Sequence, residues 1–397
     1  MLRIFYGAAG TGKSAAIMDE IRRSGADGRR CILLVPEQYS HEAERELSAK
    51  CGDGLSLYAE VLSFTGLARE VRAECGGTAE EYLDKGGRLL CMALATGALY
   101  SRLRVYAAAR RKAELQTMLL GAVDEFKSAC ITSEQLLSAA DTCDGALGDK
   151  LHDLGLILEA YDGVVANGRA DPADRLSVLA QQIERSSIGA DTRIFVDGFT
   201  DFTAQERRVL EALMLSGAEL TVCLSCDELG GGSEVFALGR ITAAALVRFA
   251  GDNGIEVKKT RWTGESTKRR PLSDFAENMF SYRAVEASDA DGCIEIMTAP
   301  DMNTECEFAA SEALCLVREL GCRWRDIAVC AKGFDDYRLM LESAFSRYGA
   351  PIYTARKADM LSKPLPALIA AAYEIILGGW EADDVFEYLR TGFGGLD

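Results

Sequence analysis

The sequence predicts an α/β protein whose strands form a parallel sheet beside a phosphate-binding loop, and three observations carry that prediction. Residues 6–15 read YGAAGTGKSA, which contains the pattern G-x-x-x-x-G-K-[ST] directly after an apolar run at residues 2–6. Strand and helix patterns alternate over residues 1–77, and the alternation returns over residues 189–262. Strands joined through helices run parallel in one sheet that helices cover on both faces.

The elements of the first part follow from the pattern in chain order. The phosphate loop opens a helix that extends to about residue 23. A buried strand follows in CILLVPEQYS at residues 31–40, then a helix over residues 41–50 and a strand in YAEVLSF at residues 58–64. The sheet resumes at residues 194–196, after which Thr203 and Glu206 predict a capping box at the start of the next helix.

Helices alone are predicted over residues 78–188, which makes this stretch a helical insertion in the first sheet domain. Leucines recur at helical spacing between residues 147 and 158. Asp171 followed by Pro172 is typical of a helix start, because aspartate caps the free N–H groups and proline suits the first turn.

A second domain is predicted after a polar connection at residues 263–292, which contains TGESTKRRPLSD. Residues 293–397 again alternate strand and helix patterns, with strands expected at residues 294–298, 327–330 and 352–354. The apolar segment at residues 365–377 is too short to cross a membrane and predicts a buried helix. No convincing cap ends the sequence, so we expect the full-length protein to continue beyond residue 397.

Composition limits the classes of function. The net charge of −17 disfavours a protein that binds nucleic acid over its whole surface, so any DNA contact must use local basic patches. The 13 cysteines have no disulfide-framework spacing, and neither a leader nor a membrane-spanning run is visible. We therefore expect a cytoplasmic protein with reduced thiols and no membrane contact.

The phosphate loop predicts ATP and Mg²⁺ as ligands. Its glycines allow backbone N–H groups to point at phosphate oxygens, and the helix that follows offers its positive end. Lys13 is expected at the outer phosphates and the Ser14 hydroxyl on magnesium. The alternative is a glycine-rich turn that matches by chance. The nucleotide-binding residues expected from the motif are Gly7, Gly10, Thr11, Gly12, Lys13 and Ser14.

The second half of such a site is an acidic residue at the end of a neighbouring strand. IFVDGF supplies Asp197 as the second magnesium ligand, with a simple Asp-Gly turn as the alternative. An enzyme that hydrolyses ATP usually has a carboxylate beside this position to accept a proton from water, and here Gly198 stands in that place. Asp201 is the nearest substitute. The motif therefore predicts binding without turnover.

Several segments resemble a known family. VDGFTDF is similar to the VDEFQD signature of UvrD-like superfamily 1 helicases, with the Glu and Gln lost. YGAAGTGKS, LLVPEQ, EVLSFTGLA, FVDGFTDFTAQE, the segment from DIAVCAKGF to YTARK, and LSKPL together resemble the amino-terminal part of the AddB (RexB) subunit of bacterial AddAB-type helicase-nucleases. The resemblance follows the same order along nearly the whole chain.

That resemblance implies two RecA-like domains, the first carrying the helical insertion, in a body that does not itself drive translocation. It implies an AddA-type helicase-nuclease subunit as partner, DNA both single- and double-stranded as ligand, and a role in repair of double-strand breaks. The family's nuclease domain and iron-sulfur cluster lie in its carboxy-terminal region, so no cysteine of this segment is assigned to that cluster. Lys332 occupies a place where active relatives commonly have an arginine near the γ-phosphate.

DNA contacts are expected at the carboxyl ends of the strands and on the insertion. Aromatic side chains there can stack on any base, and polar ones can form hydrogen bonds. The loop candidates are Gln38, Tyr39, Ser63, Phe64 and Thr65, with core packing as the alternative for Phe64. The basic run of Arg110, Arg111 and Lys112 is the best insertion candidate, with a solvated face as its alternative.

Three functions therefore compete. The leading hypothesis is a nucleotide-binding, DNA-guiding subunit of a complex that processes double-strand breaks. A self-sufficient P-loop ATPase, helicase motor or kinase is the second, and a pure scaffold with a vestigial phosphate loop is the third.

Overall fold

The computed structural model describes residues 1–52, 54–76, 82–107, 113–264, 270–279, 292–354, 360 and 363–394. The chain divides into two compact units, Met1–Ile294 and Glu295–Asp397, which are described separately.

The first unit is built on a six-stranded sheet in which every strand pair is parallel. The strand order is β3-β2-β4-β5-β1-β6. The predicted α/β class with a parallel sheet is confirmed. The strands are β1 (Leu2–Gly7), β2 (Arg30–Leu34), β3 (Ala59–Leu62), β4 (Thr192–Val196), β5 (Glu219–Ser225) and β6 (Val257–Arg261).

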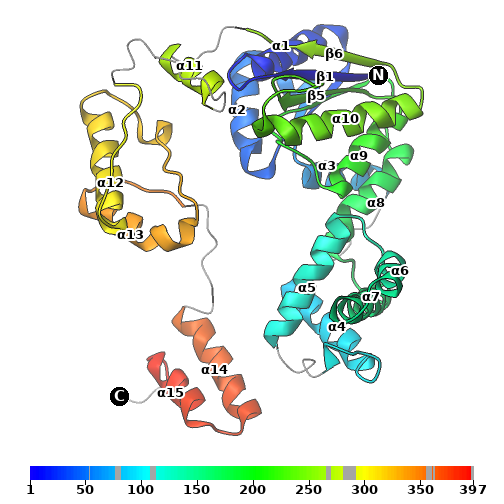
Figure 1. Ribbon diagram of the computed structural model, residues 1–397, viewed down its shortest axis with the longest axis vertical. Coiled ribbons are helices and arrows are strands. Elements are labelled where there is room, and N and C mark those ends of the chain that lie inside the picture. The colour runs from blue at the N-terminus through cyan, green and yellow to red at the C-terminus, as the bar shows by residue number, and fades with distance from the viewer. Residues whose placement is uncertain are drawn as a thin grey trace. The chain divides into compact units, whose positions relative to one another are not determined.

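Helices cover both faces of this sheet (Figure 1). Because successive strand residues point to opposite faces, Ile4 packs into one core while Phe5 packs into the other. The core on the Phe5 side includes residues of α1 (Lys13–Asp27) and α2 (Ser40–Cys51). The core on the Ile4 side is completed by α3 (Phe64–Glu74), α8 (Arg175–Gln182), α9 (Ala204–Leu215) and α10 (Ala237–Asp252).

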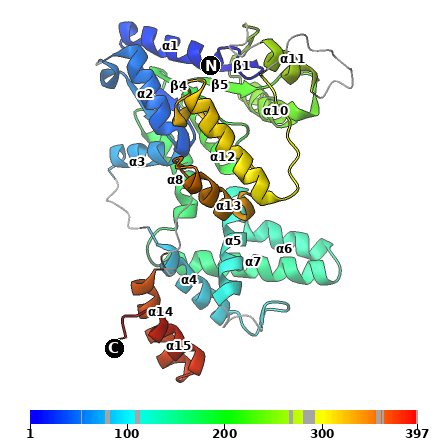
Figure 2. The same ribbon diagram turned by 90° about the vertical axis from the view of Figure 1, so that its left-hand side faces the viewer.

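The stretch between β3 and β4 contains a helical group with its own core (Figure 2). Its helices are α4 (Lys85–Ala98), α5 (Ala113–Ser128), α6 (Ser133–Thr142) and α7 (Ala146–Val165). Tyr161 and Ile157 of α7 are almost fully buried in this core, whereas Leu147 is 58% exposed. The helical leucine pattern therefore indicated the helix correctly but overstated its buried face.

Two predicted helix starts are confirmed by their hydrogen bonds. The Thr203 hydroxyl accepts from the Glu206 N–H, and the Glu206 carboxylate accepts from the Thr203 N–H. Asp171 accepts from the Ala173 N–H at 3.0 Å before the short 3₁₀ turn Pro172–Asp174. In both cases a local side chain satisfies N–H groups that a helix start leaves without partners.

The second unit differs from the expected sheet domain. Residues 294–298, 327–330 and 352–354 form neither strand nor helix within the described part of this unit. Those three strand predictions are wrong at the level of pairing, because an apolar run becomes a strand only when a neighbouring strand accepts its hydrogen bonds. Ile296 is 91% exposed and Tyr353 is 90% exposed.

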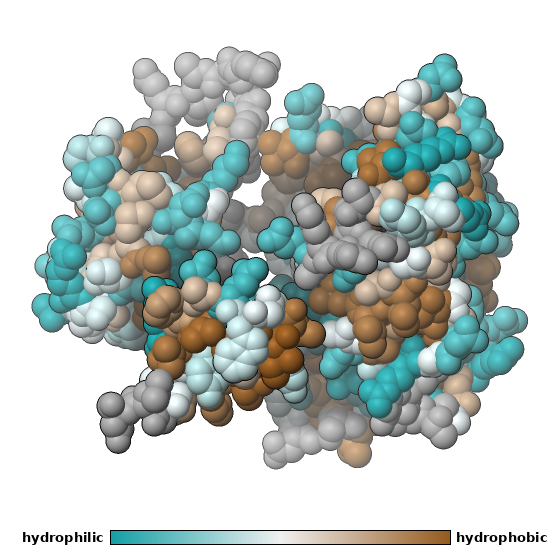
Figure 3. Space-filling model, turned by 90° about the horizontal axis from the view of Figure 1, so that it is seen from below, coloured by the Kyte–Doolittle hydropathy of each residue, from teal (hydrophilic) through white to brown (hydrophobic). Residues whose placement is uncertain are grey.

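Helices dominate the described residues of the second unit. Its small core joins α12 (Met302–Arg318) to α13 (Phe334–Arg347). The hairpin of α14 (Pro364–Gly378) and α15 (Ala382–Arg390) buries Ala371 and Ile375, but Tyr373 and Leu377 are exposed. The expectation that residues 365–377 form a buried helix is therefore wrong, since only one stripe of α14 meets α15. Apolar side chains also reach the surface on the face seen in Figure 3.

The predicted connection contains a helix, α11 (Arg270–Asn278), among its described residues. None of the described helices is both long enough and apolar enough to cross a lipid bilayer.

A buried carboxylate fixes one loop of the insertion. Asp153 has a fully buried side chain and accepts hydrogen bonds from the backbone N–H groups of Arg104, Val105 and Tyr106, at 2.7–3.1 Å. Burial by itself raises the pKa of Asp153, but these hydrogen bonds outweigh it and leave the pKa below its ordinary value.

We expect Asp153→Ala to lower the free energy of unfolding of the insertion by about 2–3 kcal/mol, because buried N–H groups lose their acceptor. Asp149→Ala is the matched control, since that half-buried carboxylate pairs with the Arg104 side chain and contributes about 0.5 kcal/mol. Urea denaturation and amide exchange at residues 104–106 measure both variants.

The same group predicts the pH dependence. Since the folded pKa of Asp153 is depressed, its contribution is present above the ordinary carboxyl pKa near 3.8 and is lost as pH falls through the folded value. Equal unfolding free energies for the two variants at neutral pH would contradict this assignment.

Candidate nucleotide-binding site

The phosphate loop joins the end of β1 to the start of α1. Gly10 has φ 85° and Gly12 has φ 88°, a left-handed backbone that favours glycine over residues with a side chain. Gly12 caps α1 without a side-chain hydrogen bond, so no side chain caps the first N–H groups of the helix. The Thr11 hydroxyl donates to the Ala8 carbonyl at 2.9 Å and closes the loop on itself. Such an arrangement leaves a positive helix end facing the loop.

Lys13 lies under the loop rather than in solvent. Its Nζ donates to the carbonyl oxygens of Gly7 at 2.8 Å and Ala8 at 2.7 Å, and the residue is 8% exposed. Burial lowers the pKa of Lys13, while nearby Cys223 and Asp197 act in the opposite direction. An ammonium group has three N–H donors, so one remains for a phosphate oxygen. Ser14 is exposed on the first turn of α1.

Asp197 follows β4 directly, and its N–H donates to the Leu34 carbonyl at 3.0 Å. Strand β5 separates β4 from β1, and Cys223 of β5 lies between the two halves of the site. Burial first, and then the negative charge of Asp197, raises the pKa of the Cys223 thiol, whereas Lys13 lowers it. Asp197 and Lys13 therefore both act on the same buried thiol. Cys223 and Cys226 form a CxxC pair in the sequence, and both thiols are buried.

Gly198 adopts a left-handed backbone with φ 82°. A Cβ atom there would lie 3.2 Å from Pro36 Cδ and 3.8 Å from Tyr39 Cδ1. The position at which an active enzyme would carry its carboxylate is therefore both conformationally restricted and closely packed. Asp201 is exposed three residues further on.

The DNA candidates at residues 38 and 39 lie on the short 3₁₀ turn Glu37–Tyr39 that follows β2. Gln38 is exposed, and Tyr39 is half-buried with its hydroxyl 3.3 Å from Glu46 Oε2. Burial, followed by the charge of Glu46, raises the pKa of Tyr39 to about 12. Thr65 is half-buried in the first turn of α3.

The DNA roles expected for Ser63 and Phe64 need correction. The Ser63 hydroxyl accepts from the Gly66 N–H at 3.1 Å as the cap of α3, and Ser63 is 8% exposed. Phe64 is 5% exposed and packs edge-on against Phe199 and Phe202, with ring centroids 5.5 Å and 6.3 Å away. Both side chains are committed to structure, so Phe64 takes its alternative role in the core.

The last four expected residues do not belong to the described part of the first unit. Arg110, Arg111 and Lys112 lie outside the residues that the structure describes. Lys332 is exposed in the second unit, and its role near a γ-phosphate stays a prediction. Motif matching also missed the cluster of Phe64, Phe199 and Phe202, for which the spacing FTDF was the available signal.

We expect Gly198→Ala to destabilise the first unit by about 1 kcal/mol more than Gly254→Ala. Both glycines have a left-handed backbone, which costs a side-chain-bearing residue about 1–2 kcal/mol, but a Cβ at residue 254 meets no atom within 4 Å. Thermal or urea unfolding measures the difference. Equal losses of stability in the two variants would show that Pro36 and Tyr39 move to accommodate the added methyl group.

Comparison with known proteins places this site in a family. The family described as "ADDB, N-terminal" matches residues 4–276. Three similar relatives are each named as a subunit of an ATP-dependent helicase/deoxyribonuclease. The relative from Caldanaerobacter subterraneus subsp. tengcongensis is 30% identical over 100% of this chain and 35% of its own length. The relative from Desulforudis audaxviator is 32% identical over 98% of the chain and 35% of its length, and that from Heliobacterium modesticaldum is 33% identical over 98% and 34%.

The chain thus spans about a third of the length of these relatives. The family profile covers the phosphate loop, the insertion and the strand that carries Asp197. This chain belongs to the AddB family, and it corresponds to the amino-terminal portion of that family's proteins.

Proposed function

We propose that this chain is the nucleotide-binding, DNA-guiding part of an AddB-type subunit, in an ATP-dependent helicase-nuclease that processes double-strand DNA breaks. In this proposal it binds ATP and magnesium but does not drive translocation. The observation that carries the proposal is the pairing of an ordered phosphate loop with Gly198, whose packed position lacks the carboxylate needed for turnover.

The geometry of the loop fits a triphosphate. Gly10 and Gly12 shape the loop, the uncapped start of α1 offers N–H groups, and Lys13 is already held beneath it. Mg²⁺, when bound, would neutralise charge on the phosphates, with the Ser14 hydroxyl and the Asp197 carboxylate as its protein ligands. The influence of Asp197 on the pKa of Lys13 supports placing both residues on one ligand.

The same geometry disfavours hydrolysis of bound ATP. A missing general base typically costs about 10² to 10⁴ in rate. Asp201 carries the nearest carboxylate that follows Gly198 in the chain, but it is exposed to solvent. We therefore assign motion along DNA to an AddA-type partner, a role that agrees with the word "subunit" in the names of the relatives.

The DNA-guiding surface in this proposal is narrower than the sequence suggested. Gln38, Tyr39 and Thr65 keep accessible side chains at the carboxyl ends of β2 and β3, where parallel sheets bind ligands. Arg110, Arg111 and Lys112 remain predicted phosphate contacts. The proposal places the complex in the cytoplasm and the iron-sulfur cluster in the family's carboxy-terminal region.

We expect Lys13→Ala to weaken ATP binding in the presence of Mg²⁺ by about 10- to 100-fold, because a charge-assisted hydrogen bond is worth about 1.5–3 kcal/mol. Calorimetric titration measures this effect. Lys150→Ala, which removes an exposed lysine of α7, is the matched control. Unchanged ATP affinity in Lys13→Ala would favour a scaffold with a vestigial loop.

Phosphate release distinguishes the proposal from a motor or a kinase. With ATP and Mg²⁺, the wild-type chain should release phosphate at the background rate both with and without single-stranded DNA. Rapid release that DNA stimulates and Lys13→Ala abolishes would establish an active ATPase instead.

We expect Tyr39→Leu to weaken binding of single-stranded DNA by about tenfold, since stacking of a base on an aromatic ring contributes about 1–3 kcal/mol. Leucine keeps most of the volume that packs beside Gly198. The salt dependence of binding should not change, because no charge is removed. Tyr373→Ala on α14 serves as the control, and fluorescence anisotropy with a labelled oligonucleotide provides the readout.

A further inference from the structure

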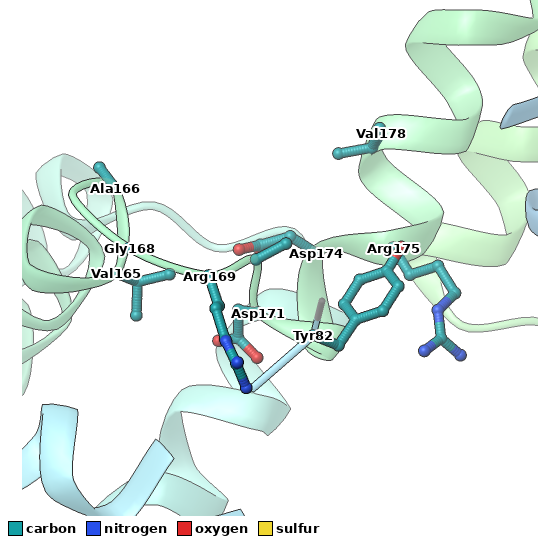
Figure 4. A pocket seen from close by; sticks show the side chains of 10 residues that line it. Tyr82, Val165, Ala166, Gly168, Arg169, Asp171, Asp174, Arg175 and Val178 are labelled. Atoms are coloured by element: carbon teal, nitrogen blue, oxygen red, sulfur yellow. The ribbon is translucent and has the colours of Figure 1, made fainter. Parts of the chain in front are cut away.

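A second pocket lies where the insertion returns to the sheet domain, within the first unit (Figure 4). It is a cavity of about 460 Å³, and its lining includes Tyr82, Val165, Arg169, Asp171, Asp174 and Arg175. These residues come from the end of α7, the loop and 3₁₀ turn that follow it, the start of α8, and the segment before α4. None of them belongs to the phosphate loop or to the candidate DNA loops.

Several contacts hold Tyr82 in place in the wall of this pocket. The chain beside it is held by the hydrogen bond from the Leu83 N–H to the Ala170 carbonyl at 2.9 Å. Its hydroxyl accepts from Arg72 Nη1 at 2.9 Å. The guanidinium carbon of Arg175 lies 4.5 Å from the centroid of the Tyr82 ring. An arginine stacked on an aromatic ring is held in one orientation, so less entropy is lost when it binds a ligand.

Arg175 also has an N–H donor without an acceptor. Among the described residues it forms no ion pair with a carboxylate, and its Nε is buried without a hydrogen-bond partner. By contrast, Arg3 pairs with Glu20 at 2.6 Å and Arg240 pairs with Asp227 at 3.2 Å. A buried guanidinium N–H without an acceptor is unfavourable, and a bound anion would remove that cost.

The acidic residues in the wall do not supply that anion, because other cations already hold them. The Asp171 side chain is fully buried and binds Arg88 Nε at 2.9 Å and Lys127 Nζ at 3.1 Å. Lys127 Nζ also lies 2.7 Å from Asp174. Figure 4 shows the Tyr82 ring between Arg169 and Arg175. The Arg175 guanidinium is therefore the cation that this wall can offer a ligand.

We propose that this pocket binds a phosphate group, with the Arg175 guanidinium as its ligand. A planar guanidinium matches two phosphate oxygens at once, which a lysine ammonium does not. The phosphate belongs either to the backbone of a DNA strand or to a small free anion. The first source rests on the proposed DNA-guiding function, and the second does not.

The test uses the full chain and two substitutions at one position. Arg175→Met removes the guanidinium but keeps an unbranched apolar stem, while Arg175→Lys keeps the charge and removes the planar fork. Arg208→Met is the matched control, because Arg208 is exposed on α9. Thermal unfolding establishes that each variant folds, and Arg175→Lys carries the test if Arg175→Met does not.

The first measurement is binding of a labelled single-stranded oligonucleotide over a range of salt concentrations. We expect Arg175→Met to weaken binding about tenfold and to lower the salt slope by about 0.7, the value for one phosphate of a single strand. Arg175→Lys should weaken binding while it keeps the slope. Arg208→Met should change neither quantity.

The second measurement uses inorganic phosphate in a Lys13→Ala background, which removes competition from the phosphate loop. The Nε–Hε resonance of Arg175, identified by its loss in Arg175→Lys, should shift on titration with phosphate. A shift without any effect on the oligonucleotide would assign the pocket to a small anion. If neither the oligonucleotide nor inorganic phosphate responds to Arg175, the proposal is overturned.

The oligonucleotide measurement and the inorganic phosphate titration also distinguish this proposal from the proposed function. Arg175→Met should leave ATP binding unchanged, since the pocket and the phosphate loop share no residue. If the wild-type chain binds no oligonucleotide at all, the DNA-guiding function fails while the inorganic phosphate titration still decides the pocket.

Discussion

The parallel register of the central strands is the constraint on which the candidate site depends. Strands β4, β5 and β1 are neighbours, with Val196 opposite Val222 and Gly7 opposite Ser225, so their carboxyl ends meet at one edge of the sheet. Because of this register, Lys13 and Asp197 influence the same buried thiol although 184 positions separate them along the chain (197 − 13). With a different strand order, the acidic residue that follows β4 would not lie near the phosphate loop.

The edge that holds nucleotide candidates also holds the loops proposed to meet DNA. Gly198 packs against Pro36 and Tyr39, which belong to the loop after β2. Phe199 packs on Phe64, the first residue of α3. The strand end that carries Asp197 is thus in direct contact with both segments. These packed contacts join the candidate nucleotide site to the loops proposed to meet DNA.

The insertion is fixed to the sheet domain by buried charge rather than by a continuous apolar core. Asp171 lies between the two and is satisfied by Arg88, Lys127 and a backbone N–H. A fully satisfied buried carboxylate sets geometry narrowly, because any displacement leaves a charge without a partner. That precision at the junction is what positions Arg175 and Tyr82 at the adjoining pocket.

Short-range patterns determined much of this protein. The phosphate loop, the capping box at Thr203 and the alternation of strand and helix in the first unit follow from spacing over a few residues, and the sequence alone predicted them. Tertiary packing decided the rest. Phe64 was assigned to core or DNA only by its partners Phe199 and Phe202, which are remote in sequence. The apolar runs predicted as strands in the second unit pair with no strand among its described residues. A pattern specifies what a segment can become, whereas burial and pairing depend on segments that meet only in the folded chain.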